Sequence, residues 1–134
     1  YDPVHRRLYE AVVGQGVFLD GAPLPPIREA ASGPTKWFAD RSLQHHPRFE
    51  RVRDHFDVRF VGGAVMNGLQ LLTEPNSCYC KAPKERVGGC AIWDLAAVSL
   101  MLRERSGSAR CYDGSPLPLN QSTNSWSNLC PVSR

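Results

Sequence analysis

A single acidic residue stands in the most apolar segment of the chain. Asp94 is the only charged side chain between Ile92 and Leu102, where almost every other residue is apolar. A helix that is apolar on nearly every side is typical of a buried helix, and a buried ionised carboxylate is costly unless donors or a cation meet it. Asp94 therefore either accepts hydrogen bonds from free backbone N–H groups in the first helical turn, or binds a cation.

Two glycines mark a second candidate site. Gly62 and Gly63 follow a short predicted strand and come directly before Ala64, where a helix is expected to begin. Free N–H groups at such a strand-to-helix turn can hold an anion. The turn matches neither the Walker nor the dinucleotide-binding fingerprint, and a tight turn needs glycine in any case. Anion binding and plain turn geometry therefore both remain open.

The cysteines offer little metal chemistry. Cys78 and Cys80 stand two residues apart and point to the same face if their segment is a strand, whereas zinc sites usually use a cysteine pair with two intervening residues on a tight turn. The pair His45 and His46 lies far away in the sequence. The chain has 5 cysteines, and an odd number favours reduced thiols over a disulfide framework. We therefore expect packed thiols rather than a zinc site.

Length and composition place the chain among ordinary globular domains. It has 134 residues, of which 42% are hydrophobic and 22% charged, so a wholly disordered chain is not expected. The net charge is +3 without a long basic run, so nucleic acid is not an expected partner. No apolar run reaches the ~18 residues of a membrane span, and the first residues do not resemble a signal peptide. Because the sequence does not begin with Met, we expect its biological start to lie upstream of Tyr1.

The sequence pattern predicts alternating strands and helices. Strands are expected at 7–13, 17–19, 58–61, 78–81 and 109–112, a tight turn at 20–21, and an ambiguous strand at 36–39. Helices are expected at 46–56, 64–72 and 92–105, the last ending at Gly107. Phe49, Val52 and Phe56 are expected to lie on one stripe of the first helix, and Val65, Leu69 and Leu72 are expected to face inward from the second. Alternation after Val58 indicates an α/β fold, with one domain over 1–121 and an irregular tail over 122–134.

Four segments, taken in order, resemble the inositol monophosphatase family. The segment from Gly89 to Ala97, with Trp93 and Asp94 at its centre, is similar to the second signature of that family, as is 103–107 after it. Residues 1–21 are similar to the central hairpin of the family, and 62–67 to its Gly-Ser-Ala strand-to-helix turn. Residues 113–120 are similar to the end of members that include 3'(2'),5'-bisphosphate nucleotidases. Only the Trp-Asp helix is specific by itself, and the other segments add weight through their order.

The resemblance implies a fold, an activity and a cofactor. The implied fold is a layered mixed α/β sheet with flanking helices. The implied activity is Mg²⁺-dependent hydrolysis of a small phosphomonoester, an inositol phosphate or a 3'(2'),5'-bisphosphate nucleotide. Asp94 would be a metal ligand, in agreement with the preference of hard cations for oxygen. Gly63, Ala64 and Val65 would lie near the substrate through backbone groups, and Glu85 would contact it.

The chain also departs from the family pattern. The first signature, Asp-Pro-x-Asp-Gly followed by Thr or Ser, is absent. Asp94 alone cannot form a complete Mg²⁺ site, so the chain resembles only the C-terminal half of such a phosphatase and is expected to be inactive alone. The implied partners are a small phosphorylated metabolite and the missing N-terminal half of the same fold, without nucleic acid or membrane. A homodimer stays open, and the expected location is the cytoplasm. The alternative is a non-catalytic α/β module that binds a phosphate or a protein partner.

Overall fold

The chain begins with a small antiparallel sheet. The computed structural model describes residues 1–27, 33–81, 91–111, 113–120 and 129–133. Strands β1 (Tyr9–Val12), β2 (Gly16–Leu19) and β3 (Ala22–Pro23) pair in the order β1-β2-β3. Asp20 and Gly21 have φ values of 52° and 79°, the positive values that a two-residue hairpin turn needs. The predicted hairpin and its tight turn are confirmed.

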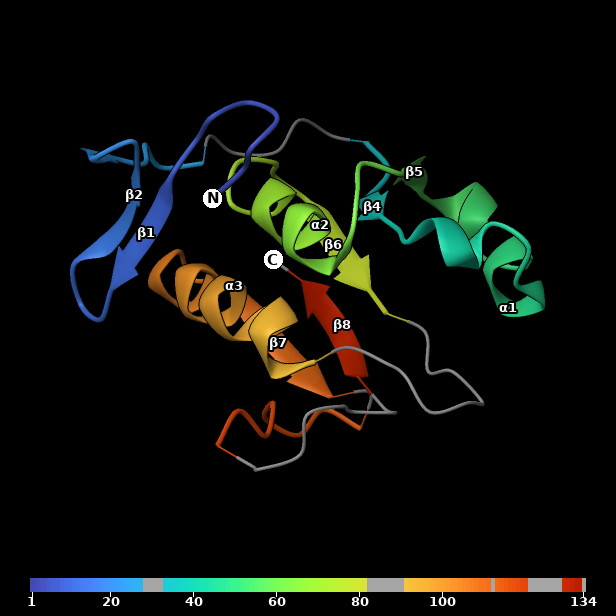
Figure 1. The fold of residues 1–134 in the computed structure, drawn as a ribbon. Helices are drawn as coiled ribbons and strands as arrows, with labels where there is room; N and C mark the ends of the chain where they lie inside the picture. The colour runs from blue at the N-terminus through green and yellow to red at the C-terminus, as the bar shows by residue number, and fades with distance from the viewer. Residues whose placement is uncertain (28–32, 82–90, 112, 121–128, 134) are drawn as a thin grey trace.

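A second, mixed sheet carries the carboxyl-terminal part of the chain. Its strands are β4 (Lys36–Phe38), β5 (Asp57–Arg59), β6 (Ser77–Cys80), β7 (Ser108–Cys111) and β8 (Leu129–Ser133), in the order β5-β4-β6-β8-β7. Strand β4 runs parallel to both β5 and β6, whereas β8 runs antiparallel to β6 and β7. Figure 1 shows β8 between β6 and β7. The prediction of an α/β fold with a mixed sheet and flanking helices is confirmed.

Strand β8 corrects the expectation of an irregular tail. Residues 129–133 belong to the segment that was expected to be irregular, yet they pair with β6 on one side and β7 on the other. Two neighbouring strands satisfy the backbone groups of β8 on both edges, and this tertiary pairing outweighs weak strand propensity. Residues 122–128 lie outside the described part of the chain, so the rest of that prediction is not tested.

The segment 46–56 is not the single helix that its pattern predicts. It forms α1 (Pro47–Glu50) and a separate 3-10 turn, η2 (Arg53–His55). The break lets both Phe49 and Phe56 pack against the ring of Trp37. Their ring centroids lie 5.1 and 5.3 Å from the Trp37 ring centroid. In one continuous helix the two residues would be about 10 Å apart along the axis. Val52, expected on the same stripe as Phe49 and Phe56, is 38% exposed.

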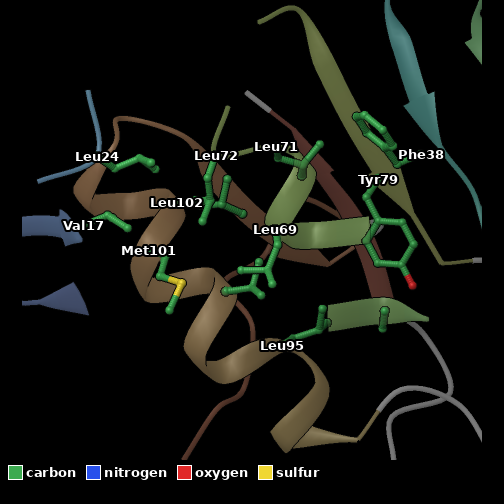
Figure 2. Packing of buried hydrophobic residues seen from close by; sticks show 12 residues of the cluster. Val17, Leu24, Phe38, Leu69, Leu71, Leu72, Tyr79, Leu95, Met101 and Leu102 are labelled. Carbon is green, nitrogen blue, oxygen red and sulfur yellow. The ribbon is translucent and has the colours of Figure 1, made fainter. Parts of the chain in front are cut away.

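Helices α2 (Ala64–Gln70) and α3 (Ile92–Glu104) form a layer between the two sheets. Helix α3 contacts β1 and β2 on one side and β7 on the other, and α2 contacts α3 and β4. Figure 2 shows the apolar side chains of this interior, among them Leu69, Tyr79 and Leu102. The aromatic cluster around Trp37 lies on the opposite face of the mixed sheet, because Trp37 alternates with Phe38 along β4.

Two details of these helices differ from the sequence analysis. Val65 was expected to face inward and is 37% exposed, whereas Leu69 and Leu72 are buried as predicted. Helix α3 is buried on one face only, since Trp93 is 66% exposed. No helix within the described ranges is long and apolar enough to cross a membrane.

The end of α3 agrees with its prediction. Helix α3 ends at Glu104, next to the predicted bound at residue 105, and Ser106 beyond it takes the left-handed conformation, with φ 61°. The Gly107 N–H then donates to Leu102 O at 2.8 Å and closes the last turn. A Cβ on Gly107 would lie 3.2 Å from Leu102 Cδ2, so close packing is a reason for glycine there.

Candidate functional site

The carboxyl ends of the three parallel strands β4, β5 and β6 meet at one edge of the mixed sheet. Phe38 is paired with Arg59 of β5 and with Tyr79 of β6, so the chain leaves all three strands at the same level. Asp40 follows β4, the Gly62–Gly63 turn follows β5, and Lys81 follows β6. Ligands of open α/β sheets usually bind outside the carboxyl ends of the strands. This edge is therefore the candidate site.

The first turn of α2 presents free backbone donors at this edge. Gly63 is the N-cap, in an extended conformation with φ −77°, and no described side chain caps the helix. Within the described ranges, no acceptor meets the backbone N–H groups of Gly63, Ala64 and Val65. A Cβ on Gly63 would meet no atom within 4 Å, so the space in front of the turn is open. Such unpaired N–H groups can receive an anion.

A buried polar cluster lies directly beneath this turn. Asn67 is fully buried, and its Nδ2 donates to Gly62 O and to Asp40 Oδ1, each at 3.1 Å. The buried Tyr79 hydroxyl donates to the same Asp40 oxygen at 3.1 Å. Asp40 Oδ2 lies 2.8 Å from Lys81 Nζ, with both side chains largely buried. We call these four residues, Asp40, Asn67, Tyr79 and Lys81, the Asp40 cluster.

No member of the Asp40 cluster was predicted from the sequence as a site residue. Asp40 stands at the N-cap of η1 (Arg41–Leu43), where an Asp is typically read as a capping residue. Its side chain makes no capping hydrogen bond and turns into the interior instead. The positions of Asp40 and Lys81 in the sequence could have indicated them, because each follows an apolar strand by one or two residues.

Asp94 lies in the first turn of α3 and is partly buried. Its Oδ2 accepts a hydrogen bond from Ala91 N at 2.9 Å. This contact is the backbone satisfaction that was one of the two sequence interpretations. In the part of the chain that the structure describes, Oδ1 has no hydrogen-bond partner.

The starts of α2 and α3 lie at the same end of a packed helix pair. The helices touch at Gly68 and Val98, where an added Cβ on Gly68 would come within 2.5 Å of Val98 Cγ1. In Figure 1 both helices run in the same general direction. Ala64 and Asp94 each precede this contact by four residues, about one helical turn. The structure thus brings the Gly62–Gly63 turn and Asp94 to the same end of the pair.

Other site predictions are only partly covered. Glu85, expected to contact the substrate, lies outside the described residues. Among the described residues, no group of three or more His, Cys, Asp or Glu side chains could hold a metal ion.

Burial, with a smaller contribution from Cys80, raises the pKa of the Cys78 thiol to about 11. Cys78 therefore stays protonated near neutral pH, which disfavours thiolate chemistry at this strand.

Comparisons with known proteins place the fold. No family model matches the sequence, and no curated protein matches it. A crystal structure of a dual-specific IMPase/NADP phosphatase bound with D-inositol-1-phosphate matches with a TM-score of 0.76 at 16% identity, covering 99% of this chain and 48% of that one. A structure of an IMPase/NADP phosphatase complexed with Mg²⁺ and phosphate also has a TM-score of 0.76, at 16% identity, and the match covers 99% of this chain and 47% of that one.

A second relative is somewhat more similar in sequence. Inositol monophosphatase-II from Staphylococcus aureus matches with a TM-score of 0.72 at 22% identity, again over 99% of this chain and 48% of that chain. The chain spans about half the length of each of these structures. It therefore has the α/β fold of one half of an inositol monophosphatase family structure.

Proposed function

We propose that this chain is the C-terminal half of a divalent-metal-dependent phosphomonoesterase of the inositol monophosphatase family. The observation that carries the proposal is the shared end of α2 and α3. Three backbone N–H groups lie there at the start of α2 and meet no acceptor among the described residues, and Asp94 is proposed to offer a carboxylate oxygen at the start of α3. Donors for a phosphate beside a ligand for a cation are what phosphate-ester chemistry requires.

In this proposal the first turn of α2 binds the phosphate group. The N–H groups of Gly63, Ala64 and Val65 donate to phosphate oxygens, and the open space in front of Gly63 admits the ester. Val65 is 37% exposed, in agreement with a place near the bound substrate. Glu85 remains our proposal for a further contact to the substrate.

Asp94 fits a metal site as one ligand among several. Mg²⁺ takes oxygen ligands in near-octahedral geometry, commonly one or two carboxylates with water and substrate phosphate. Asp94 Oδ1 is of the right type, while the described part of the chain contains no second and third ligand beside it. The remaining carboxylates are proposed to come from the N-terminal half of the fold. A bound Mg²⁺ would supply charge neutralisation at the phosphate and a more acidic water.

Substrate, assembly and location follow as further parts of the proposal. Structures with this fold have been determined with D-inositol-1-phosphate, with 2'-AMP and with NADP, so an inositol phosphate or a phosphorylated nucleotide is the substrate class we favour. The N-terminal half of the fold is the main proposed partner, and a homodimer stays open. We propose a cytoplasmic location.

One observation favours a second candidate, a non-catalytic module that binds a phosphate or a protein partner. Asp94 Oδ2 already has a structural role at the start of α3, and the described residues contain no three-ligand metal group. A module of this kind would keep the donors of α2 without any metal chemistry.

An assay of the full-length gene product separates the two candidates. Phosphate release from inositol phosphates and from bisphosphate nucleotides is measured with Mg²⁺ and after chelation with EDTA. The phosphatase proposal expects release that requires Mg²⁺. Binding of inorganic phosphate with no release at any Mg²⁺ concentration would instead support the module.

A further inference from the structure

Exposed apolar side chains gather at the start of the chain. Within residues 1–13, several apolar side chains are between 43% and 81% exposed, namely Tyr1, Val4, Leu8, Val12 and Val13. Tyr9 and Ala11 of β1 pack against the core, so Leu8 and Val12, which alternate with them, lie on the opposite face of the small sheet. A group of exposed apolar residues typically marks a surface that another segment or partner covers.

Strand β1 is also an edge of its sheet. Within the described ranges it pairs with β2 alone, and successive residues of an antiparallel strand direct their N–H and C=O groups alternately toward and away from the partner. Leu8 O accepts from Asp20 N at 2.9 Å, so the backbone groups of Leu8 face β2. Those of Tyr9 and Ala11 therefore point to the free edge. No partner among the described residues meets these outward groups.

The first residues of the chain turn back onto this free edge. Asp2 N donates to Arg7 O at 2.8 Å and Arg7 N donates to Asp2 O at 3.1 Å, the two-bond exchange of an antiparallel pair. Asp2 Oδ1 also accepts from Val4 N at 3.0 Å and from His5 N at 3.2 Å, and so stabilises the turn between the paired residues. The chain at Asp2 therefore already runs antiparallel to the segment that enters β1.

The register of this pair determines what would lie opposite the rest of β1. Because Asp2 pairs with Arg7, the residue directly before Tyr1 would lie opposite Tyr9, and the third residue before Tyr1 opposite Ala11. Both positions fall on the residues of β1 whose backbone groups point outward. A chain that continued upstream in the same direction would therefore satisfy these groups without any change in β1.

We propose that the segment directly upstream of Tyr1, a strand of the N-terminal half of the fold, adds antiparallel to the free edge of β1 and makes β1 an interior strand. The inference rests on the proposed function, in which such a half precedes this chain, and it names the surface on which that half docks. The solved structures leave room for this occupant, since the chain spans about half of each. A second copy of the chain fits less well, because Asp2 already covers the edge at Arg7.

Hydrogen exchange of the full-length protein tests the proposal, because β1 carries its own internal control. The N–H groups of Glu10 and Val12 face β2 and are protected with or without an added strand. We expect the amides of Tyr9 and Ala11 to exchange about a hundredfold or more slowly than in an unstructured peptide, because an added strand accepts from them. Exchange near the peptide rate at Tyr9 and Ala11, with Glu10 and Val12 protected, would overturn the proposal.

Two substitutions of Asp2 test the turn that brings the chain onto this edge. Asp2→Ala removes the acceptor of Val4 N and His5 N, whereas Asp2→Asn keeps an oxygen for both and is the matched control. In the full-length protein Asp2→Ala should speed exchange at Tyr9 and Ala11 about tenfold, and Asp2→Asn less than about twofold. Equal exchange rates in the two variants would overturn the role of the turn.

These measurements are independent of phosphatase activity. Protected amides at Tyr9 and Ala11 in a full-length protein that releases no phosphate would support the docking surface and count against the proposed function. Phosphate release by a protein in which both amides exchange freely would do the reverse. Protection that disappears when a dimer dissociates on dilution would assign the edge to a second copy and overturn the proposal.

Discussion

Helices α2 and α3 begin at the same end of the molecule but treat their first turns differently. Asp94 covers a backbone N–H at the start of α3, where its Oδ2 accepts from Ala91 N at 2.9 Å. At the start of α2 no side chain in the described ranges does this, and Asn67 instead donates to the Gly62 carbonyl from the interior side. Free N–H groups at a helix start carry partial positive charge. The start of α3 is thus capped by its own acid, while the first N–H groups of α2 meet no acceptor in the part of the chain that the structure describes.

The two helix starts differ in whether they stabilise the fold in the absence of a ligand. A helix start that is capped internally contributes to folding whether or not a ligand is present. A start left open gives up that contribution and gains it only when an anion binds. The Asp40 cluster explains how the open start keeps its shape, because the network orders the turn without using the N–H groups that face outward.

The largest effect is expected for Asp94→Asn in the full-length protein. Asn keeps an oxygen that can accept from Ala91 N, so the cap and the fold should persist. The negative charge proposed to meet the metal is lost, and phosphatase turnover at saturating Mg²⁺ should fall about a hundredfold or more. Phosphate release and thermal denaturation measure the two effects.

Asp94→Ala provides the matched control for this prediction. It removes the cap as well as the charge, and it should lower the free energy of unfolding by about 1 kcal/mol relative to Asp94→Asn. Equal turnover in the wild type and Asp94→Asn would remove the metal role and leave only the cap. The contrast between the starts of α2 and α3 would then be purely structural.

The second effect concerns the contact that keeps the two helix starts together. A Cβ on Gly68 would lie 2.5 Å from Val98 Cγ1, so Gly68→Ala must push α2 and α3 apart. Overpacking of this kind typically costs about 1–3 kcal/mol, against a gain of about 1 kcal/mol in helix propensity. Urea denaturation should show a lower free energy of unfolding.

Val98→Ala tests whether this contact is the cause. The double variant Gly68→Ala with Val98→Ala makes room for the new methyl group, so the two changes should be less damaging together than their sum. Strict additivity of the two free energies would show that the helices do not touch at this point.

How much of this arrangement the sequence predicts depends on the range of the interactions. The Asp20–Gly21 turn and the boundaries of α3 were predicted because a few neighbouring residues determine them. The break between α1 and η2 was not, because it depends on Trp37, which precedes Phe49 by twelve residues. Strand β8 was missed for the same reason, since its order comes from pairing with β6 and β7.

The candidate site shows the same division. Asp94 and the Gly62–Gly63 turn could be found by residue type and spacing, because each stands in a short motif. The role of Asp40 depends on Asn67 and Tyr79, which follow it by 27 and 39 residues. Asp40 also stands at a position where a capping role is the ordinary reading. Only the packed structure shows that its carboxylate turns inward.

The third effect distinguishes the two glycines at the open start. A Cβ on Gly62 would lie 2.9 Å from Met66 Cβ, whereas a Cβ on Gly63 would meet nothing within 4 Å. Gly62→Ala should therefore lower the free energy of unfolding by about 1 kcal/mol or more. Gly63→Ala, at an unstrained φ of −77°, should change it by less than about 0.5 kcal/mol. Equal losses in thermal denaturation would contradict the close approach at Gly62.

The smallest effect is expected at the opposite end of α3, where the comparison between open and closed ends can be extended. Glu104 stands in the last turn, a position where a negative charge is unfavourable. Its Oε2 accepts from Gly14 N at 2.9 Å and from Gly16 N at 3.2 Å, and so ties α3 to the turn of the β1–β2 hairpin. The acid at this end therefore caps another element of the fold, not its own helix.

Glu104→Ala should lower the free energy of unfolding by about 1 kcal/mol, since both contacts are lost at a partly exposed site. Glu104→Gln keeps an acceptor for the two glycines and relieves the unfavourable charge, so its stability should stay within about 0.5 kcal/mol of the wild type. Urea denaturation of the three proteins decides the point. If Glu104→Ala is as stable as Glu104→Gln, the hairpin does not depend on Glu104. Alanine loses both hydrogen bonds to the glycines while glutamine can keep them, so a stabilising contact would make the alanine variant the less stable of the two.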